Sequence, residues 1–272
     1  MTEGRNTGVA MWSRELGGGD ADPLLMLHAF PLNGRMFEPQ MEAISGGRRV
    51  IAPDLPGFGL SPRTPAQPDV GYYAGCVRAL LDRLEVPRVV LGGISMGGYV
   101  AFECMRSFPE RVSGLVLANT RPDADTEEAR QTRKEMALRV AQEGIGVLTE
   151  IQMGRLLSER TRAENRDVIE RVREIILENT PDGAVAALGA MRERPDSTET
   201  LGGITVPTLV VGGAEDTISS PEVMGEMAAR IPDARHVTLP GVGHLSSLED
   251  PEGFNEALTG FLESARTPAA AG

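Results

Sequence analysis

The sequence is poor in the side chains that bind metal ions. Its 272 residues include three histidines, His28, His236 and His244, and no Cys/His cluster with the spacing of a zinc site. The two cysteines, Cys76 and Cys104, each fall in a predicted amphipathic helix, and their separation suits two buried thiols better than a disulfide or a metal site. We therefore expect no metal ion, and we expect the cytoplasm as the compartment.

Long apolar runs and an excess of positive charge are also missing. No apolar stretch approaches the ~20 residues that a membrane-spanning helix needs. The first ten residues, MTEGRNTGVA, lack the basic and apolar segments of a signal peptide. The formal net charge of −12 argues against nucleic-acid binding and would repel anionic membranes. We expect neither a nucleic-acid partner nor a membrane partner.

What the chain does contain is a series of short apolar runs. They are rich in leucine and β-branched residues with little alternation, as in strands buried on both faces of a parallel sheet: Arg49–Ala52, Arg88–Gly92, Val112–Ala118, Thr208–Gly212 and Arg235–Leu239. Two earlier runs, Gly8–Leu16 and Leu24–His28, are joined by a turn-rich segment, and this pattern predicts a β-hairpin.

Helical patterns alternate with these strands, which predicts a doubly wound α/β sheet flanked by helices. They cover Gly71–Leu84, Met96–Ser107, Pro221–Ile231 and Pro251–Ala265. Between residues 121 and 201 there is no strand pattern, and helical patterns follow one another: Thr126–Glu143, Gly146–Ser158, Arg162–Glu178 and Ala184–Arg192. We predict a core domain of residues 1–120 and 202–272, with residues 121–201 inserted as a helical cap. The charged residues at 123–139 are expected on the solvated face of this cap, and the tail TPAAAG is expected to be disordered.

A glycine-rich strip, LGGISMGGYV at residues 91–100, lies where a predicted strand meets a predicted helix. Gly93 and Gly97 stand two positions before and after Ser95, giving Gly-Ile-Ser-Met-Gly, the G-x-S-x-G pattern. A sharp strand-to-helix turn holds its central residue in a sparsely allowed conformation and needs small neighbours at those two positions. A phosphate-binding loop would need a following lysine or the G-x-G-x-x-G spacing, and the strip has neither. The strip therefore predicts a nucleophile elbow, with Ser95 as the nucleophile.

A serine hydroxyl is a weak nucleophile, so a base and an orienting acid must accompany it. His244, in the stretch GVGHL, directly follows the last predicted strand, whereas His236 lies inside that strand and is expected to be structural. The acid should come between nucleophile and base in chain order, and Asp216 follows the preceding strand. Its neighbour Glu215 and the earlier Asp123 are the competing carboxylates. We predict a triad of Ser95, Asp216 and His244.

Taken together, these motifs resemble the α/β-hydrolase fold superfamily over nearly the whole chain, and in particular its small capped esterases, lactonases and perhydrolases. The motifs that carry the resemblance, in chain order, are His28-Ala29-Phe30-Pro31, the segment DLPGFGLS at 54–61, the elbow Gly93–Gly97, the acid loop Gly213–Pro221 and Gly243-His244. Ala29 departs from the family pattern, which usually has glycine at this position. The alanine adds a methyl group near the loop that follows His28.

The resemblance implies hydrolysis of a small carboxylic ester through an acyl-enzyme, without a cofactor. It implies an oxyanion hole formed by the backbone N–H groups of Phe30 and Met96, whose side chains are also expected to wall the substrate pocket. A serine nucleophile argues against dehalogenase, epoxide hydrolase and dienelactone hydrolase activity. A lactonase, a cofactor-free perhydrolase or haloperoxidase, a thioesterase and carbon–carbon bond cleavage remain as alternatives, and so does a ligand receptor without catalysis.

The predicted cap has apolar residues that could face the site. The candidates are Met136, Leu138, Ile145, Leu148, Met153, Leu156, Leu157 and Met191. Because this face is apolar, we expect a small, uncharged acyl substrate. The sequence leaves homodimer formation open.

Overall fold

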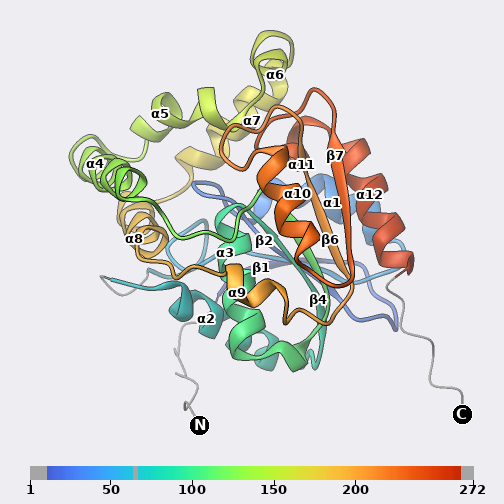
Figure 1. Ribbon diagram of the computed structural model, residues 1–272. Coiled ribbons are helices and arrows are strands. Elements are labelled where there is room, and N and C mark those ends of the chain that lie inside the picture. Colours follow the sequence, from blue (N-terminus) through green and yellow to red (C-terminus); the bar gives the residue numbers. More distant parts are fainter. Residues whose placement is uncertain (1–10, 64–66, 265–272) are drawn as a thin grey trace, which may run out of the picture.

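The computed structural model describes residues 11–63 and 67–264, so the start of the first predicted strand and the tail TPAAAG lie outside the described residues. Within these ranges, seven strands form one sheet in the order β1-β3-β2-β4-β5-β6-β7 (Figure 1). The strands are β1 (Ser13–Leu16), β2 (Leu24–Leu27), β3 (Val50–Pro53), β4 (Val89–Ile94), β5 (Val112–Ala118), β6 (Thr208–Gly213) and β7 (Ala234–Leu239). β1 is antiparallel to β3, and the other pairings are parallel.

The predicted hairpin between the first two strands is wrong. β1 pairs with β3, where Leu16 lies opposite Val50, and β2 lies on the other side of β3. All four residues of β2 are buried, because this strand forms parallel ladders with both β3 and β4. β1 is an edge strand, and Leu16 is 44% exposed. The turn-rich segment between the strands therefore carries the chain across the sheet instead of folding it back on itself.

Helices between the strands and after β7 cover both faces of the sheet, since every residue of β2, β3, β4 and β6 is buried. These helices are α1 (Glu38–Ile44), α2 (Val70–Arg83), α3 (Met96–Ser107), α10 (Pro221–Ala229), α11 (Ser246–Glu249) and α12 (Pro251–Ser264). α2 packs on α3, and α1 packs on α12. The seven-residue α1 and the four-residue α11 were not predicted, because segments this short show too little periodicity. Cys76 and Cys104 are both buried and neither forms a disulfide, as predicted.

Between β5 and β6 the chain is helical: α4 (Glu127–Glu143), α5 (Val147–Leu156), α6 (Glu159–Glu164), α7 (Arg166–Leu177), α8 (Pro181–Arg192) and α9 (Thr198–Leu201). α4 to α8 gather on one side of the sheet, coloured green to yellow in Figure 1. The predicted single helix Arg162–Glu178 is two helices. They separate at Asn165, whose side chain accepts the Val168 N–H and caps α7.

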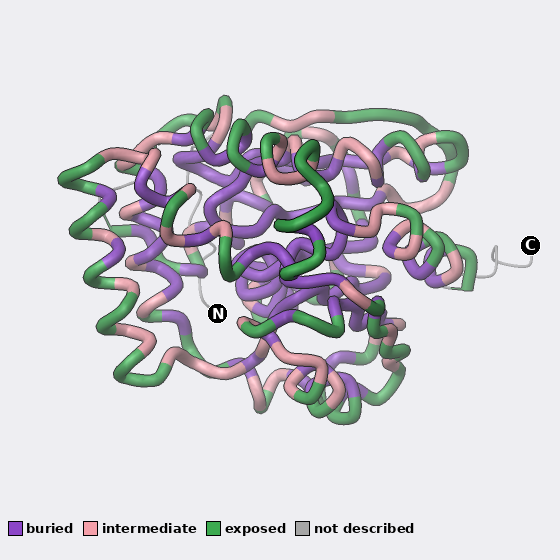
Figure 2. The backbone as a smooth tube through the Cα atoms, turned by 90° about the horizontal axis from the view of Figure 1, so that it is seen from above, coloured by how far each residue is buried: buried purple, intermediate pink, exposed green. Residues whose placement is uncertain are grey.

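The buried residues form one continuous core that includes side chains of the sheet, the flanking helices and the α4–α9 segment. Figure 2 shows these residues concentrated at the centre of the molecule, with the exposed ones on the outer turns of the helices. Among the described residues, no helix combines the length and apolar character needed to cross a membrane.

Candidate active site

Ser95 lies at the sharp turn between β4 and α3. Its backbone has φ of 53° and ψ of −112°, a conformation that non-glycine residues rarely adopt and that costs about 1–3 kcal/mol. A Cβ atom on Gly93 would lie 2.3 Å from the Gly97 carbonyl oxygen, and one on Gly97 would lie 2.1 Å from that of Leu27. The two glycines of the G-x-S-x-G pattern are therefore required by close backbone approach, as the sequence predicted.

His244 and Asp216 meet in the loops that follow β7 and β6. His244 Nδ1 lies 2.8 Å from Asp216 Oδ2, and both side chains are almost completely buried. Asp216 Oδ1 accepts the backbone N–H groups of Ile218 and Ser219. Burial by itself raises the pKa of Asp216, but His244, Asn119 and Ser219 together hold that pKa below its usual value. The carboxylate therefore stays ionised beside the imidazole.

Asn119, directly after β5, is a residue of this site that the sequence analysis missed. Its Nδ2 donates to Asp216 Oδ2 at 2.9 Å and to the Gly243 carbonyl at 3.2 Å, while its Oδ1 accepts the Ser246 hydroxyl at 2.5 Å. Asn119 is fully buried and has a φ of 43°, in the left-handed region that asparagine tolerates. Its place at the carboxyl end of a strand, in the pair Asn119-Thr120, was the signal that could have identified it.

A cavity of about 340 Å³ joins the predicted nucleophile and base, since Ser95 and His244 both line it. Its apolar lining includes Phe30, Tyr99, Met136, Leu156, Met191 and Ile218. Met96, expected beside Phe30 in the pocket wall, is 1% exposed and packs in the core below the elbow. As the first residue of α3, however, Met96 has a backbone N–H without a partner inside the helix.

Phe30 belongs to a loop that His28 holds in place. His28 Nε2 accepts the Leu55 N–H at 3.0 Å, so the proton is on Nδ1, which donates to the Ala29 carbonyl at 3.0 Å. Burial lowers the pKa of His28 to about 4. The ring is therefore neutral at physiological pH and links the Ala29–Phe30 loop to the segment after β3.

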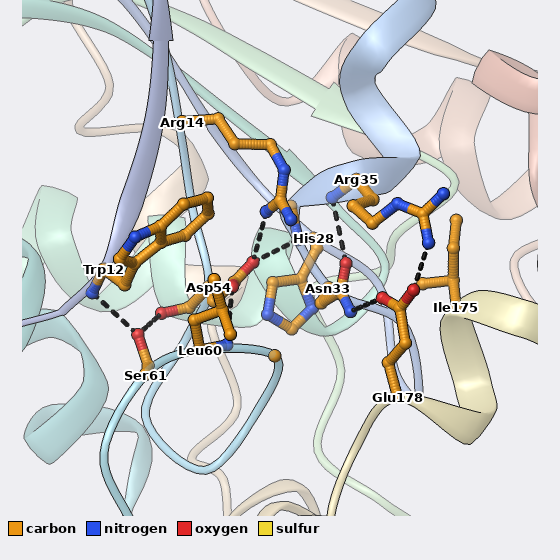
Figure 3. Close-up of polar contacts among 12 residues, drawn as sticks. Trp12, Arg14, His28, Asn33, Arg35, Asp54, Leu60, Ser61, Ile175 and Glu178 are labelled. Atoms are coloured by element: carbon orange, nitrogen blue, oxygen red, sulfur yellow. Dashed lines mark hydrogen bonds and ion pairs between the residues drawn. The ribbon is translucent and has the colours of Figure 1, made fainter.

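Asp54, the first residue of the DLPGFGLS segment, organises the neighbouring backbone (Figure 3). Its Oδ1 accepts the Gly34 N–H at 2.8 Å and pairs with Arg14 at 3.0 Å, and its Oδ2 accepts the Leu60 N–H at 2.9 Å. The Ser61 hydroxyl donates to the Asp54 carbonyl at 2.5 Å. This motif therefore supports the loop that carries Phe30 and contributes no residue to the lining of the cavity.

The α4–α9 segment is attached to the Phe30 loop through the end of α7. Asn33 Nδ2 donates to Glu178 Oε2 at 3.0 Å, and Arg35 forms an ion pair with the same carboxylate (Figure 3). The neighbouring Asn179 donates to the Pro31 carbonyl at 2.7 Å. These bonds fix the loop relative to the helices above it.

A second attachment holds the loop of His244. The Leu156 carbonyl at the end of α5 accepts the His244 N–H at 3.1 Å. The Glu249 carboxylate accepts the Gly243 N–H at 3.0 Å and the Ser158 N–H at 2.8 Å. The position of the imidazole therefore depends on α5 as well as on the sheet.

The cavity is more polar than the sequence suggested. Of the eight residues expected on the inner face of the helical segment, Met136, Leu156 and Met191 line it, while Leu138 is 54% exposed. Polar and charged side chains complete the lining: Thr126, Glu128, Thr132, Arg133, Gln152 and Arg155. The expectation that residues 123–139 form a solvated face is wrong at Asp125, whose side chain is 4% exposed and pairs with Arg133. The cause is tertiary, because Arg194 approaches the same carboxylate from beyond α8.

The other candidates lie apart from this arrangement. Asp123 pairs with Arg121 and its side chain is 41% exposed, and Glu215 is exposed beside Asp216. His236 lies in edge strand β7 and is exposed, not packed in the core. Within residues 11–63 and 67–264, no three histidine, cysteine or acidic side chains are grouped as a metal ion would require.

Comparison with known proteins agrees with the fold. A family model described as the alpha/beta hydrolase fold matches residues 22–251. The acetyltransferase component of the acetoin cleaving system of Pseudomonas putida is 30% identical over 91% of this chain, which spans 65% of that protein. The 3-oxoadipate enol-lactonase 2 of Acinetobacter baylyi is 25% identical, with 94% of both chains covered. A thermophilic esterase from Thermogutta terrifontis, solved with malate bound, is 40% identical with a TM-score of 0.92, over 95% of each chain.

Proposed function

The chain belongs to the α/β-hydrolase fold family of hydrolases, and on that basis we propose that it is a serine hydrolase that cleaves a small carboxylic ester through an acyl-enzyme. The observation that carries the proposal is the 2.8 Å contact of His244 with Asp216 beside a cavity that also exposes Ser95 on its strained turn. Among the relatives, the 40% identical esterase favours an ester as the substrate.

The proposed nucleophilic step uses this arrangement directly. Because His244 Nδ1 donates to Asp216, Nε2 keeps its lone pair and can take the proton of the Ser95 hydroxyl as the oxygen attacks the ester carbonyl. The imidazolium then gives that proton to the departing alcohol. In the second half, water attacks the acyl group, His244 takes its proton, and Ser95 leaves with that proton. No cofactor is needed in either half.

The negative charge that develops on the carbonyl oxygen needs donors that are already in place. We assign this role to the backbone N–H groups of Phe30 and Met96. The Met96 N–H is at the start of α3, where the helix dipole favours negative charge. Loss of one such donor costs about 10²- to 10³-fold in rate in a serine hydrolase. The bonds of His28 and Asn179 would hold the Phe30 loop at the right place.

We further propose that residues 121–201 form a cap over a core domain of residues 1–120 and 202–272. The support is that α4, α5 and α8 contribute lining residues to the cavity of Ser95. A cap in this position would exclude bulk water from the acyl group and select substrates by the side chains on α4 and α5.

A lactone is the second candidate bond, because the relative from Acinetobacter baylyi is an enol-lactonase that covers 94% of this chain. A lactone undergoes the same attack by Ser95, and the alcohol then stays attached to the acyl group. Perhydrolysis would replace water by hydrogen peroxide in the second half. A ligand receptor would bind in the same cavity without turnover.

The test is labelling with a fluorophosphonate probe together with hydrolysis of p-nitrophenyl acetate. The parent chain should hydrolyse the ester and be labelled, and Ser95→Ala should lose both while it keeps the parent melting temperature. Ser107→Ala, at the other end of α3, is the matched control and should keep both. A folded parent chain that takes no label would favour the receptor, and retained turnover by Ser95→Ala would exclude Ser95 as the nucleophile. Side-by-side rates for esters, lactones and peracid formation would then rank the bonds.

A further inference from the structure

Two arginines line the cavity that contains Ser95 and His244. Arg133 comes from α4, and Arg155 comes from α5. Both belong to the helical segment and not to the sheet, so they lie among the groups that would meet the substrate away from the reacting carbonyl. A guanidinium group is always charged and presents several donors in a plane that matches a carboxylate.

Arg133 is part of a largely buried cluster of charged side chains. The Asp125 carboxylate pairs with Arg133 at 2.5 Å and also with Arg194, and the side chains of Asp125 and Arg194 are 4% and 3% exposed. The two guanidinium groups hold the pKa of Asp125 below its usual value against the opposing effect of burial. The Asp125 carboxylate is therefore shared by two arginines, and Asp196 is a second carboxylate near Arg194.

The two arginines of this cluster reach the cavity in different ways. Arg194 packs over the ring of Tyr99, with its guanidinium carbon 4.0 Å from the ring centroid, and Tyr99 lines the cavity. Arg133 is itself a lining residue. Its Nε and Nη2 contact Asp125, whereas its Nη1 contacts the Met191 sulfur at 3.5 Å, a weak acceptor. A stronger acceptor entering the cavity could take the place of that sulfur.

Arg155 adds a second charge that is not neutralised locally. Its side chain is exposed, and no ion pair joins it to another of the described residues. Glu128 is the one carboxylate among the described residues of the lining, so the lining side chains alone sum to +1 when Arg133 and Arg155 are counted against it. This local excess stands out in a chain whose formal net charge is −12.

We propose that the substrate of this cavity carries a carboxylate, which Arg133 and Arg155 bind while Ser95 attacks the ester group. The substrate class is then half-esters of dicarboxylic acids and esters of hydroxy acids, instead of the uncharged ester that the apolar residues of the helices suggested. This inference rests on the proposed esterase function. The volume of about 340 Å³ is at the small end of the range for small-molecule sites, which suits an acid of a few carbons.

Matched pairs of esters test the proposal directly. Monomethyl glutarate and methyl pentanoate differ in that a carboxylate replaces the terminal methyl group on the acyl side. 4-Acetoxybutanoate and butyl acetate make the same comparison on the alcohol side. We expect at least one anionic ester to exceed its neutral partner in kcat/KM by about tenfold or more, as a hydrogen bond between charged groups typically allows. The preference should shrink as the salt concentration rises.

Charge variants then assign the preference to the two arginines. Arg155→Gln should reduce the anionic-to-neutral ratio of kcat/KM by about tenfold. Arg133→Gln should do the same, and in this variant Asp125 keeps Arg194 as its partner. Arg173→Gln is the matched control, because Arg173 is exposed on α7 and does not line the cavity. It changes the net charge of the chain equally and should leave the ratio unchanged.

Equal rates for both members of each pair, or a ratio that responds to Arg173→Gln as strongly as to Arg155→Gln, would overturn the carboxylate site and leave the esterase standing. If no ester in either pair is hydrolysed and the fluorophosphonate probe fails to label the chain, the proposed function itself is wrong.

Discussion

Asn119 donates a side-chain hydrogen bond to the same oxygen of Asp216 that contacts His244. The two distances to Oδ2 are 2.9 Å and 2.8 Å. Asn119 also reaches Gly243 and Ser246, so it connects the ends of three neighbouring strands at the rim of the sheet. Asn119 therefore positions the carboxylate and the loop of the imidazole without lining the cavity.

Asn119→Gly should lower kcat by about ten- to a hundredfold with little change in KM, since a hydrogen bond to a charged group contributes about 1.5–3 kcal/mol. Glycine tolerates the positive φ at this position, so the backbone need not move.

Ser246→Ala is the control for that change. It removes the hydroxyl that Asn119 Oδ1 accepts but leaves the bond from Asn119 to Asp216 in place. Its kcat should stay within experimental error of the parent. An Asn119→Gly variant that loses stability but keeps the parent kcat would reduce Asn119 to a purely structural residue.

Asp216 and Asp123 were two of the three carboxylates considered for the acid, and their variants should differ widely. Asp216→Asn should lower kcat by about 10⁴-fold, because the amide favours the wrong imidazole tautomer, as the corresponding change does in a serine protease. Asp123→Asn should stay within a few fold, since Asp123 pairs with Arg121 at a partly exposed site. Steady-state kinetics with one ester decides between them. Greater damage from Asp123→Asn would move the acid to that position.

Two glycine-to-alanine changes in helices should have opposite effects on stability. In Gly97→Ala the new Cβ atom would lie 2.1 Å from the Leu27 carbonyl oxygen, so the elbow must shift and we expect a loss of about 3 kcal/mol together with the turnover. In Gly189→Ala, on α8, there is nothing within 4 Å of the new atom, and we expect a gain of about 0.5–1 kcal/mol. Denaturant titration of both variants at one pH gives the comparison. Equal stability of the two variants would contradict the close approach at the elbow.

The buried neutral His28 should make the fold sensitive to acid. Its pKa is lowered from 6.5 to about 4, so between these pH values the unfolded chain binds a proton that the folded chain does not. The stabilisation is complete above pH 6.5 and is lost as the pH falls toward 4, a difference of about 3 kcal/mol. The free energies of unfolding measured at pH 7 and at pH 4.5 should differ by most of this amount.

An NMR titration of the histidine ring protons gives an independent check, because His28 should stay neutral through pH 5. A His28 signal that titrates near pH 6.5 would contradict this account. His236→Gln is the control variant. His236 is exposed in edge strand β7 and should account for little of the pH dependence.

The local sequence was sufficient to predict the features that neighbouring residues determine. The backbone turn at Ser95 needs glycines two positions away on each side, so the pattern itself reveals the elbow, and the residues that follow predict α3 with the bounds it has. Strand β5 was also predicted with the ends it has, since a mostly apolar run between polar residues marks a strand that is largely buried.

Tertiary structure decided what depends on residues far apart in the chain. β1 pairs with β3 instead of β2, because β2 already has a partner strand on each side and β3 has one side left to pair. Asn119 joined the site because three strand ends meet at one rim. The cluster around Asp125 is buried because Arg194, 69 positions further on, returns to the same carboxylate. Periodicity reports which face of one element is apolar, but the charge inside a cavity depends on which elements surround it.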